Sequence, residues 1–151
     1  MNIRFMASSF VLGGALLVAT PTFAHHSFNM FDVKAENEIV LDGVVKEWNF
    51  TNPHSWLTIT VTNLDGTQTD WSFEAAAAAA LVPKGITIST YKVGDKVKVA
   101  GGPLKDGRKG AILKFVQHAN GTFTLPNDAG TIGQEALDRW KAKSSRGSGA
   151  K

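Results

Sequence analysis

The sequence predicts an all-β domain, a small five-stranded Greek-key barrel of the OB type with one short helix between strands three and four. Apolar and polar residues alternate in five short segments within residues 38–118, which is the two-residue period of half-buried strands. Turn-forming residues separate these segments, and the clearest hairpin signal is residues 63–66. A five-stranded antiparallel sandwich is the competing architecture.

The first strand is expected to be long and bent. Val40 and Trp48 share one parity along it, whereas Ile39 and Val45 share the other, so the apolar face changes near Gly43. Glycine is the usual residue at such a bend or bulge. A bent first strand can serve both halves of a barrel, which favours the barrel over the sandwich.

The second and third strands form the predicted hairpin, residues 56–62 followed by residues 68–74. Both alternate in the pattern of a half-buried strand, and the second is rich in β-branched residues. The residues that share one face are Leu57, Ile59 and Val61 in the second strand, and Thr69, Trp71 and Phe73 in the third.

An unbroken alanine run, residues 75–80, predicts the connecting helix, because alanine has the highest helix propensity. Leu81 and Val82 extend the run, and Pro83 marks its end. Residues 96–100 and about 111–117 supply the fourth and fifth strands. Farther along, residues 134–143 are expected to form a short helix that carries Leu137 and Trp140, before a disordered basic tail at residues 144–151.

The chain is expected to be exported to the periplasm or secreted. Residues 1–24 have the pattern of a signal peptide, because Arg4 precedes an apolar stretch, and Thr22 and Ala24 are small residues at a cleavage site. That stretch, residues 10–19, is shorter than the roughly 20 residues that span a bilayer. We therefore expect residues 25–121 to be the barrel with an N-terminal segment, residues 122–151 to be an extension, and no membrane segment after cleavage.

The composition excludes several classes of chemistry. The chain has no cysteine, so it holds no disulfide, thiolate metal site or cysteine nucleophile. The formal net charge is only +3, and much of the basic charge lies in the C-terminal tail, so charge predicts no nucleic-acid partner. We expect a monomer whose partner is a periplasmic protein or a small ligand.

Two histidines suggest a metal site. Cleavage after Ala24 would leave His25 at the N-terminus, followed by His26. A terminal amine and imidazole rings so close together form a nitrogen chelate that suits Cu(II), which prefers tetragonal nitrogen ligands. The terminal amine titrates near pH 7.7 to 8.0, so it can lose its proton near neutrality at little cost. A flexible terminus whose histidines have no role is the alternative.

His54 is the third candidate ligand. It follows Asn52 and Pro53 in a turn before the second strand, at a barrel end where OB folds often bind ligands. Taken alone, a turn histidine more often hydrogen-bonds to the backbone. The apolar side chains of Met30 and Phe31 could anchor the N-terminal segment across the barrel and bring His25 toward His54.

Five further residues are candidates for supporting or ligand-binding roles. Glu74, at the end of the third strand, could orient an imidazole ring or could simply be a solvated carboxylate. Asn52 belongs to the same turn as His54. Trp48, Trp56 and Trp71 could form an aromatic face for a small ligand, although packing also explains them.

Several segments of the chain together match a known sequence pattern, and these are residues 25–28, 43–48, 51–56, 71–74, 94–97 and 103–107. In these segments the chain resembles domain of unknown function family 6152, a family of small exported bacterial proteins. The resemblance implies export and an all-β fold, and it implies no function. The alanine run and His118 depart from the family pattern.

These observations favour an exported metal-binding barrel that takes copper through His25, His26 and His54. An interaction or small-ligand-binding module without metal is the alternative. An enzyme ranks lowest, because no catalytic triad, phosphate loop, dinucleotide fingerprint or metalloprotease motif is present, and no catalytic residue is assigned.

Overall fold

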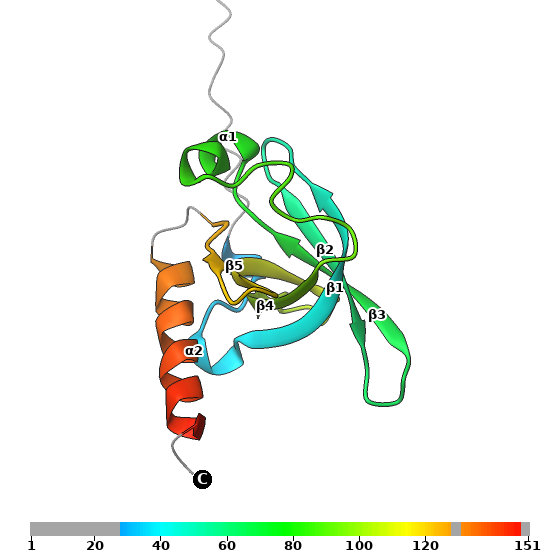
Figure 1. Ribbon diagram of the computed structural model, residues 1–151, viewed down its shortest axis with the longest axis vertical. Coiled ribbons are helices and arrows are strands. Elements are labelled where there is room, and N and C mark those ends of the chain that lie inside the picture. The colour runs from blue at the N-terminus through cyan, green and yellow to red at the C-terminus, as the bar shows by residue number, and fades with distance from the viewer. Residues whose placement is uncertain (1–27, 128–130, 149–151) are drawn as a thin grey trace, which may run out of the picture.

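The computed structural model describes residues 28–127 and 131–148, and it places a β-barrel beside a C-terminal helix (Figure 1). In the described part of the chain, no helix is long and apolar enough to cross a membrane. The strands are β1 (Ile39–Asn49), β2 (Trp56–Thr62), β3 (Gln68–Glu74), β4 (Lys96–Pro103), β5 (Gly110–His118) and β6 (Phe123–Thr124). The helices are η1 (Phe28–Met30), η2 (Ala35–Asn37), α1 (Ala78–Leu81), η3 (Val82–Lys84) and α2 (Ile132–Ser148).

Strands β1 to β5 close into the predicted barrel. Their order is β3-β2-β1-β4-β5, and every neighbouring pair in that order is antiparallel. The barrel closes where β3 pairs with β5 in parallel, with Ser72 opposite Gly110 and Glu74 opposite Ile112. This closure, with the short helix between β3 and β4, confirms the OB-type barrel and rules out the sandwich.

The bend in β1 lies at Lys46 and not near Gly43, where the sequence pattern placed it. The register between β1 and β2 shifts between Val45 and Glu47, so Lys46 is the extra residue of a bulge. Gly43 has another role, because a Cβ there would lie 2.8 Å from Ile59 Cδ1 and 2.9 Å from the Thr60 carbonyl oxygen. The glycine thus permits the close approach of β1 and β2.

The barrel core is apolar and continuous. The core is lined by side chains that the alternation placed together on one face of each strand, which are Leu57, Ile59 and Val61 of β2 and Trp71 and Phe73 of β3. The largest fully buried side chains of this core are Phe73, Leu57, Ile59, Leu81, Leu113, Val45, Val99 and Val116.

The alanine run forms less helix than its propensity predicts. Only Ala78–Leu81 is α-helical, and Ala75 and Ala76 are buried residues outside the helix. Their backbone groups bond to neighbouring segments, because the Ala75 amide donates to the Ser55 carbonyl at 2.8 Å and the Ala76 amide donates to the Pro126 carbonyl at 3.0 Å. Tertiary hydrogen bonds have replaced the helical ones that propensity favours.

Helix α2 packs against β5 through a second apolar cluster. Phe115 of β5 meets Ala136 and Leu137 of α2, and all three are buried. The aromatic ring of Trp140 completes the cluster, with its centroid 6.0 Å from that of Phe115. The helix continues to Ser148, so residues 144–148 extend it and do not form the tail that their composition predicts.

The N-terminal segment lies along the end of β4. Phe31 is buried and bridges to Leu104, and the Asp32 amide donates to the Pro103 carbonyl at 2.7 Å. The Lys105 amide donates to the Met30 carbonyl at 3.0 Å, and its Nζ donates to the Asn29 carbonyl at 2.8 Å. These bonds fix the course of the chain that follows residue 27.

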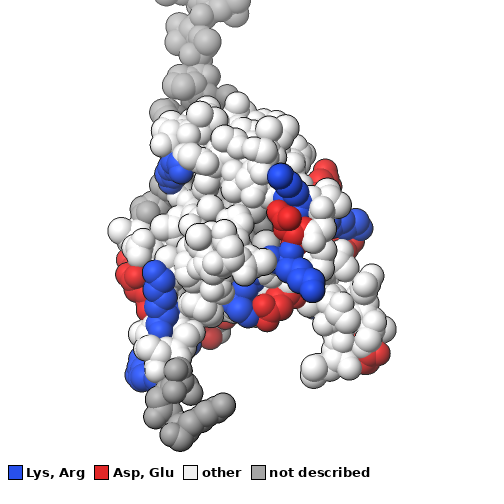
Figure 2. All heavy atoms as spheres, in the orientation of Figure 1, with Lys and Arg blue, Asp and Glu red and all other residues white. Residues whose placement is uncertain are grey.

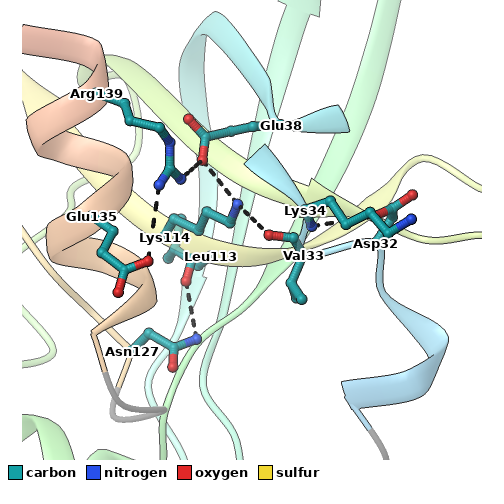
Figure 3. Close-up of polar contacts among 9 residues, drawn as sticks. All are labelled: Asp32, Val33, Lys34, Glu38, Leu113, Lys114, Asn127, Glu135 and Arg139. Atoms are coloured by element: carbon teal, nitrogen blue, oxygen red, sulfur yellow. Dashed lines mark hydrogen bonds and ion pairs between the residues drawn. The ribbon is translucent and has the colours of Figure 1, made fainter. Parts of the chain in front are cut away.

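A buried ionic cluster joins this segment to β5 and α2. Figure 3 shows Lys114 of β5 and Arg139 of α2 converging on the carboxylate of Glu38. Lys114 Nζ donates to Glu38 Oε2 at 2.8 Å and to the Val33 carbonyl at 3.1 Å, while Arg139 Nη2 donates to the same Oε2 at 2.9 Å. The cluster therefore ties three parts of the chain that are distant in sequence.

Charged side chains of both signs are interspersed on the face shown in Figure 2, and the end around α1 is largely uncharged there. No single-sign patch covers that face. The distribution agrees with the modest net charge of the chain.

Candidate functional site

The turn that carries His54 is held from within by Ser55. Ser55 is fully buried, and its Oγ donates to the Thr51 carbonyl at 3.2 Å and lies 3.3 Å from the Thr51 amide, which donates to it. The peptide bond between Asn52 and Pro53 is cis. These contacts fix the backbone on both sides of His54.

The alanine run supports the same turn from outside. The Ala78 amide donates to the Thr51 carbonyl at 3.0 Å, and the Ala79 amide donates to Asn52 Oδ1 at 3.2 Å. The Ser55 amide donates to the Ala76 carbonyl at 3.1 Å. Small side chains at these positions let the two segments pack closely, which gives the alanines a role in positioning the site.

The structure brings His54 and Glu74 together. His54 Nδ1 lies 3.0 Å from Glu74 Oε1, and the Glu74 side chain is only 12% exposed against 31% for His54. Glu74 is therefore not the solvated strand-end carboxylate that the alternative interpretation described. It is placed to accept a hydrogen bond from Nδ1, and such a contact orients the imidazole ring.

His54 and Glu74 line a groove of about 450 Å3 at this end of the barrel. Its walls are mostly apolar. Trp56, which is 38% exposed, and Met30, which is 40% exposed, both contribute. The other lining residues are Asn49, Thr51, Asn52 and Pro53.

Met30 in this groove shows where the N-terminal segment meets the barrel. The segment was expected to anchor through its apolar residues, and Phe31 is indeed buried beside Leu104. Four positions separate His26 from Met30 in the sequence. His25 and His26 lie outside the described residues.

The three tryptophans do not share one face. Trp48 and Trp71 are half-buried and pack against the barrel core, and the indole nitrogen of Trp48 donates to the Thr87 carbonyl at 3.0 Å. Only Trp56 of the three lines the His54 groove. The three tryptophans therefore do not form the aromatic face that the sequence suggested. Trp56 alone of the three is at the groove, and Trp48 and Trp71 have packing roles.

Among residues 28–127 and 131–148, no three histidine, aspartate or glutamate side chains gather as a metal-binding group. His54 and Glu74 make a pair, in which one imidazole can ligate and the carboxylate can orient it. A stable site at this groove therefore needs further ligands from elsewhere in the chain or from a partner.

His118 lies in a different environment. Its ring stacks on that of Tyr91 with centroids 5.5 Å apart, and its Nε2 lies 3.3 Å from Thr124 Oγ1. Burial lowers the pKa of His118, while the charge of Asp95 opposes that shift. His118 lines another groove, beside Asp42 and Lys98, and is separate from the candidate site.

Two residues of this site were missed by the reasoning from sequence. The sequence pattern gave Ser55 no role, although its burial makes it the internal brace of the turn. Met30 was assigned a packing role, although it is exposed at the groove. The sequence did offer a sign of the role of Met30, because it is a methionine in a segment that is otherwise anchored by phenylalanine.

The fold and the site describe a small OB-type β-barrel protein with a histidine–carboxylate pair at one mouth of the barrel. The chain belongs to the Family of unknown function (DUF6152), whose model matches residues 14–114, more than half of its length. The match includes the N-terminal segment, the His54 turn, Glu74 and four of the five barrel strands in full. No curated protein and no solved structure matches the chain.

Proposed function

We propose that the protein is an exported copper-binding protein, located in the periplasm or secreted, whose site joins the N-terminus to the barrel. His54 is the imidazole ligand on the barrel, and His25 and His26 supply the remaining nitrogen ligands. The observation that carries the proposal is the 3.0 Å contact between His54 Nδ1 and the shielded carboxylate of Glu74. Metal-bound histidines characteristically donate their second ring nitrogen to such a partner.

The course of the N-terminal segment supports the participation of the two histidines. Met30 lines the same groove as His54, and its backbone is bonded to Lys105. The four Cα–Cα steps from His26 to Met30 span at most roughly 14 Å when the chain is extended. His26 is therefore within covalent reach of the groove.

The chemistry of the donors favours Cu(II). After cleavage at Ala24, His25 would offer its terminal amine and its ring, and His26 would add a second imidazole. With His54 this makes a nitrogen-rich set, which suits a tetragonal Cu(II) ion at the top of the divalent affinity order. The proposed role is binding or handling of the metal.

The test begins with protein exported and processed by its own N-terminal sequence. Intact mass determines where the mature chain begins, and titration with Cu(II) against a competing chelator measures its affinity. We expect a chain that starts at His25 and binds one Cu(II). His54→Ala should weaken binding by at least about tenfold, which is roughly 1.4 kcal/mol.

Two further variants make the test specific. Glu74→Gln should weaken Cu(II) by about 10- to 100-fold, the usual effect of removing a partner that orients a ligand. His118→Gln, which removes a histidine from another groove, should leave the affinity unchanged. A chain that begins elsewhere, or Cu(II) binding that is indifferent to His54, would contradict the proposal.

The groove also favours a second candidate, a small-ligand-binding module without metal. Its volume, about 450 Å3, lies within the range of small-molecule sites, and its walls are mainly apolar. Trp56 would then be the principal contact. Trp56→Ala should abolish binding of a small apolar ligand and leave Cu(II) affinity unchanged if the two functions are distinct.

A further inference from the structure

Met30 is an exposed apolar residue at the candidate site. It is 40% exposed, whereas its neighbour Phe31 is buried, and its side chain faces the groove that His54 and Glu74 line. Packing does not require a methionine here, because Phe31 and the backbone bonds to residues 104 and 105 already hold the segment in place.

Met30 also matters because the chain contains few sulfur atoms. The sequence has no cysteine and three methionines, which are Met1, Met6 and Met30. Met1 and Met6 belong to the expected signal peptide, so Met30 would carry the only sulfur atom of the processed protein. That atom would then be at the candidate metal site.

From this placement we infer that Met30 supplies a thioether ligand, so that the groove holds copper in its monovalent form as well as Cu(II). The inference rests on the proposed function and extends it to the oxidation state of the metal. Thioether sulfur is a soft ligand that selects Cu(I), whereas imidazole nitrogen binds copper in both states. His54 would serve both ions, and Met30 would be specific to the reduced one.

The backbone around Met30 suits a ligand that must be held in place. The Lys105 amide binds the Met30 carbonyl, and the Lys105 side chain binds the carbonyl of the preceding residue. On the other side, Phe31 is fixed by its bridge to Leu104. The thioether is therefore carried by a fixed backbone, while its flexible side chain can adjust to the ion.

X-ray absorption on the processed protein tests the inference directly. Protein loaded with Cu(I) under a reductant, without oxygen, should show a copper–sulfur scattering path. Because Met30 would be the sole source of sulfur, its replacement in Met30→Leu should remove that path. Leucine is close to methionine in volume and apolar character, so the fold should be retained.

Affinities separate this inference from the proposed function. Met30→Leu should weaken Cu(I) by at least about tenfold and change Cu(II) affinity by less than about twofold, whereas His54→Ala should weaken both. Val33→Ala, an exposed apolar position in the same segment, is the matched control and should change neither.

Each contrary result has a distinct meaning. If the wild-type protein shows no copper–sulfur path, or if Met30→Leu leaves Cu(I) affinity unchanged while Cu(II) still depends on His54, the thioether assignment is overturned and the proposed function stands. If Cu(II) affinity does not depend on His54, the proposed function fails.

Discussion

Lys114 and Glu38 form an ion pair in the interior of the protein, with Nζ 2.8 Å from Oε2 and with side chains that are 1% and 9% exposed. Arg139 shares the same carboxylate oxygen, so one acidic group faces two cations (Figure 3). Loss of one member of a buried pair is costly because it leaves a charge without compensation. The cluster thus makes the barrel, α2 and the N-terminal segment depend on a single carboxylate.

Glu38→Gln is therefore expected to lower the free energy of unfolding by about 3–5 kcal/mol, as measured by urea denaturation. Glu36→Gln, at an exposed position of η2, is the control and should stay within about 0.5 kcal/mol of wild type. The double variant Glu38→Gln with Lys114→Met should recover part of the loss, since it removes the buried charge as well. Equal stabilities of Glu38→Gln and the control would refute the importance of the cluster.

Gly133→Ala should destabilise the protein, although alanine usually favours a helix over glycine by about 0.5–1 kcal/mol. A Cβ at residue 133 would lie 2.6 Å from the Lys114 carbonyl oxygen, so α2 would have to move away from β5. We expect a loss of about 1–3 kcal/mol in the free energy of unfolding, the range for overpacked sites. Ser144→Ala, exposed on the same helix, provides the comparison; a more stable Gly133→Ala protein would contradict the observed packing.

Leu137→Ala tests whether α2 is part of the folding unit. Leu137 is buried in the cluster between α2 and β5, and truncation of such a side chain costs about 2–5 kcal/mol. Lys141→Ala, at an exposed position, should have little effect. Chemical denaturation followed by tryptophan fluorescence and by circular dichroism should give one coincident transition, whereas separate transitions would show that α2 unfolds independently.

His118 should make stability depend on pH. Burial lowers its pKa in the folded protein, so the unfolded chain takes up the proton first as the pH falls. Neutral His118 therefore makes its full contribution to the free energy of unfolding at pH values above its unfolded pKa of about 6.5. That contribution is lost as the pH falls from there to the folded pKa.

Two measurements check this expectation. An NMR titration of the His118 ring should give a pKa below about 6.5. As the pH is lowered from about 7.5 to about 5.5, the free energy of unfolding should fall less in the His118→Gln variant than in the wild-type protein. A folded pKa equal to the unfolded value would abolish the predicted effect, and one above it would reverse its sign.

The architecture was predictable from the sequence because alternation over five segments is a strong local signal. Leu57, Ile59 and Phe73 were assigned to the correct face, and the connection between β3 and β4 was placed correctly. The position of the bend was not predictable, because Val44 and Val45 lie between Gly43 and Lys46 and put an apolar residue on each face, so the pattern allows the change of face before or after them. The length of α1 was overestimated for a related reason, since backbone bonds from Ala75 and Ala76 to distant segments leave no trace in the sequence.

The site was only partly predictable. The pattern identified His54 and Glu74 separately, but their contact joins positions that are twenty residues apart and depends on the register of β2 and β3, in which Trp56 lies opposite Glu74. The tryptophans were grouped too broadly, because composition alone gave no reason to distinguish Trp56 from Trp48 and Trp71, which pack inward.

Barrel closure has a consequence for how occupancy of the site can be read out. Glu74 lies opposite Ile112 in the β3–β5 pairing and opposite Trp56 in the β2–β3 pairing, and its side chain contacts His54. The orientation of the imidazole is therefore coupled to the last seam that completes the barrel. A ligand that binds His54 only in this orientation must, by thermodynamic linkage, raise the melting temperature as its concentration rises above its dissociation constant. Thermal shift therefore reports the affinity of this site, and Glu74→Gln should raise the ligand concentration needed for a given increase in melting temperature by about 10- to 100-fold.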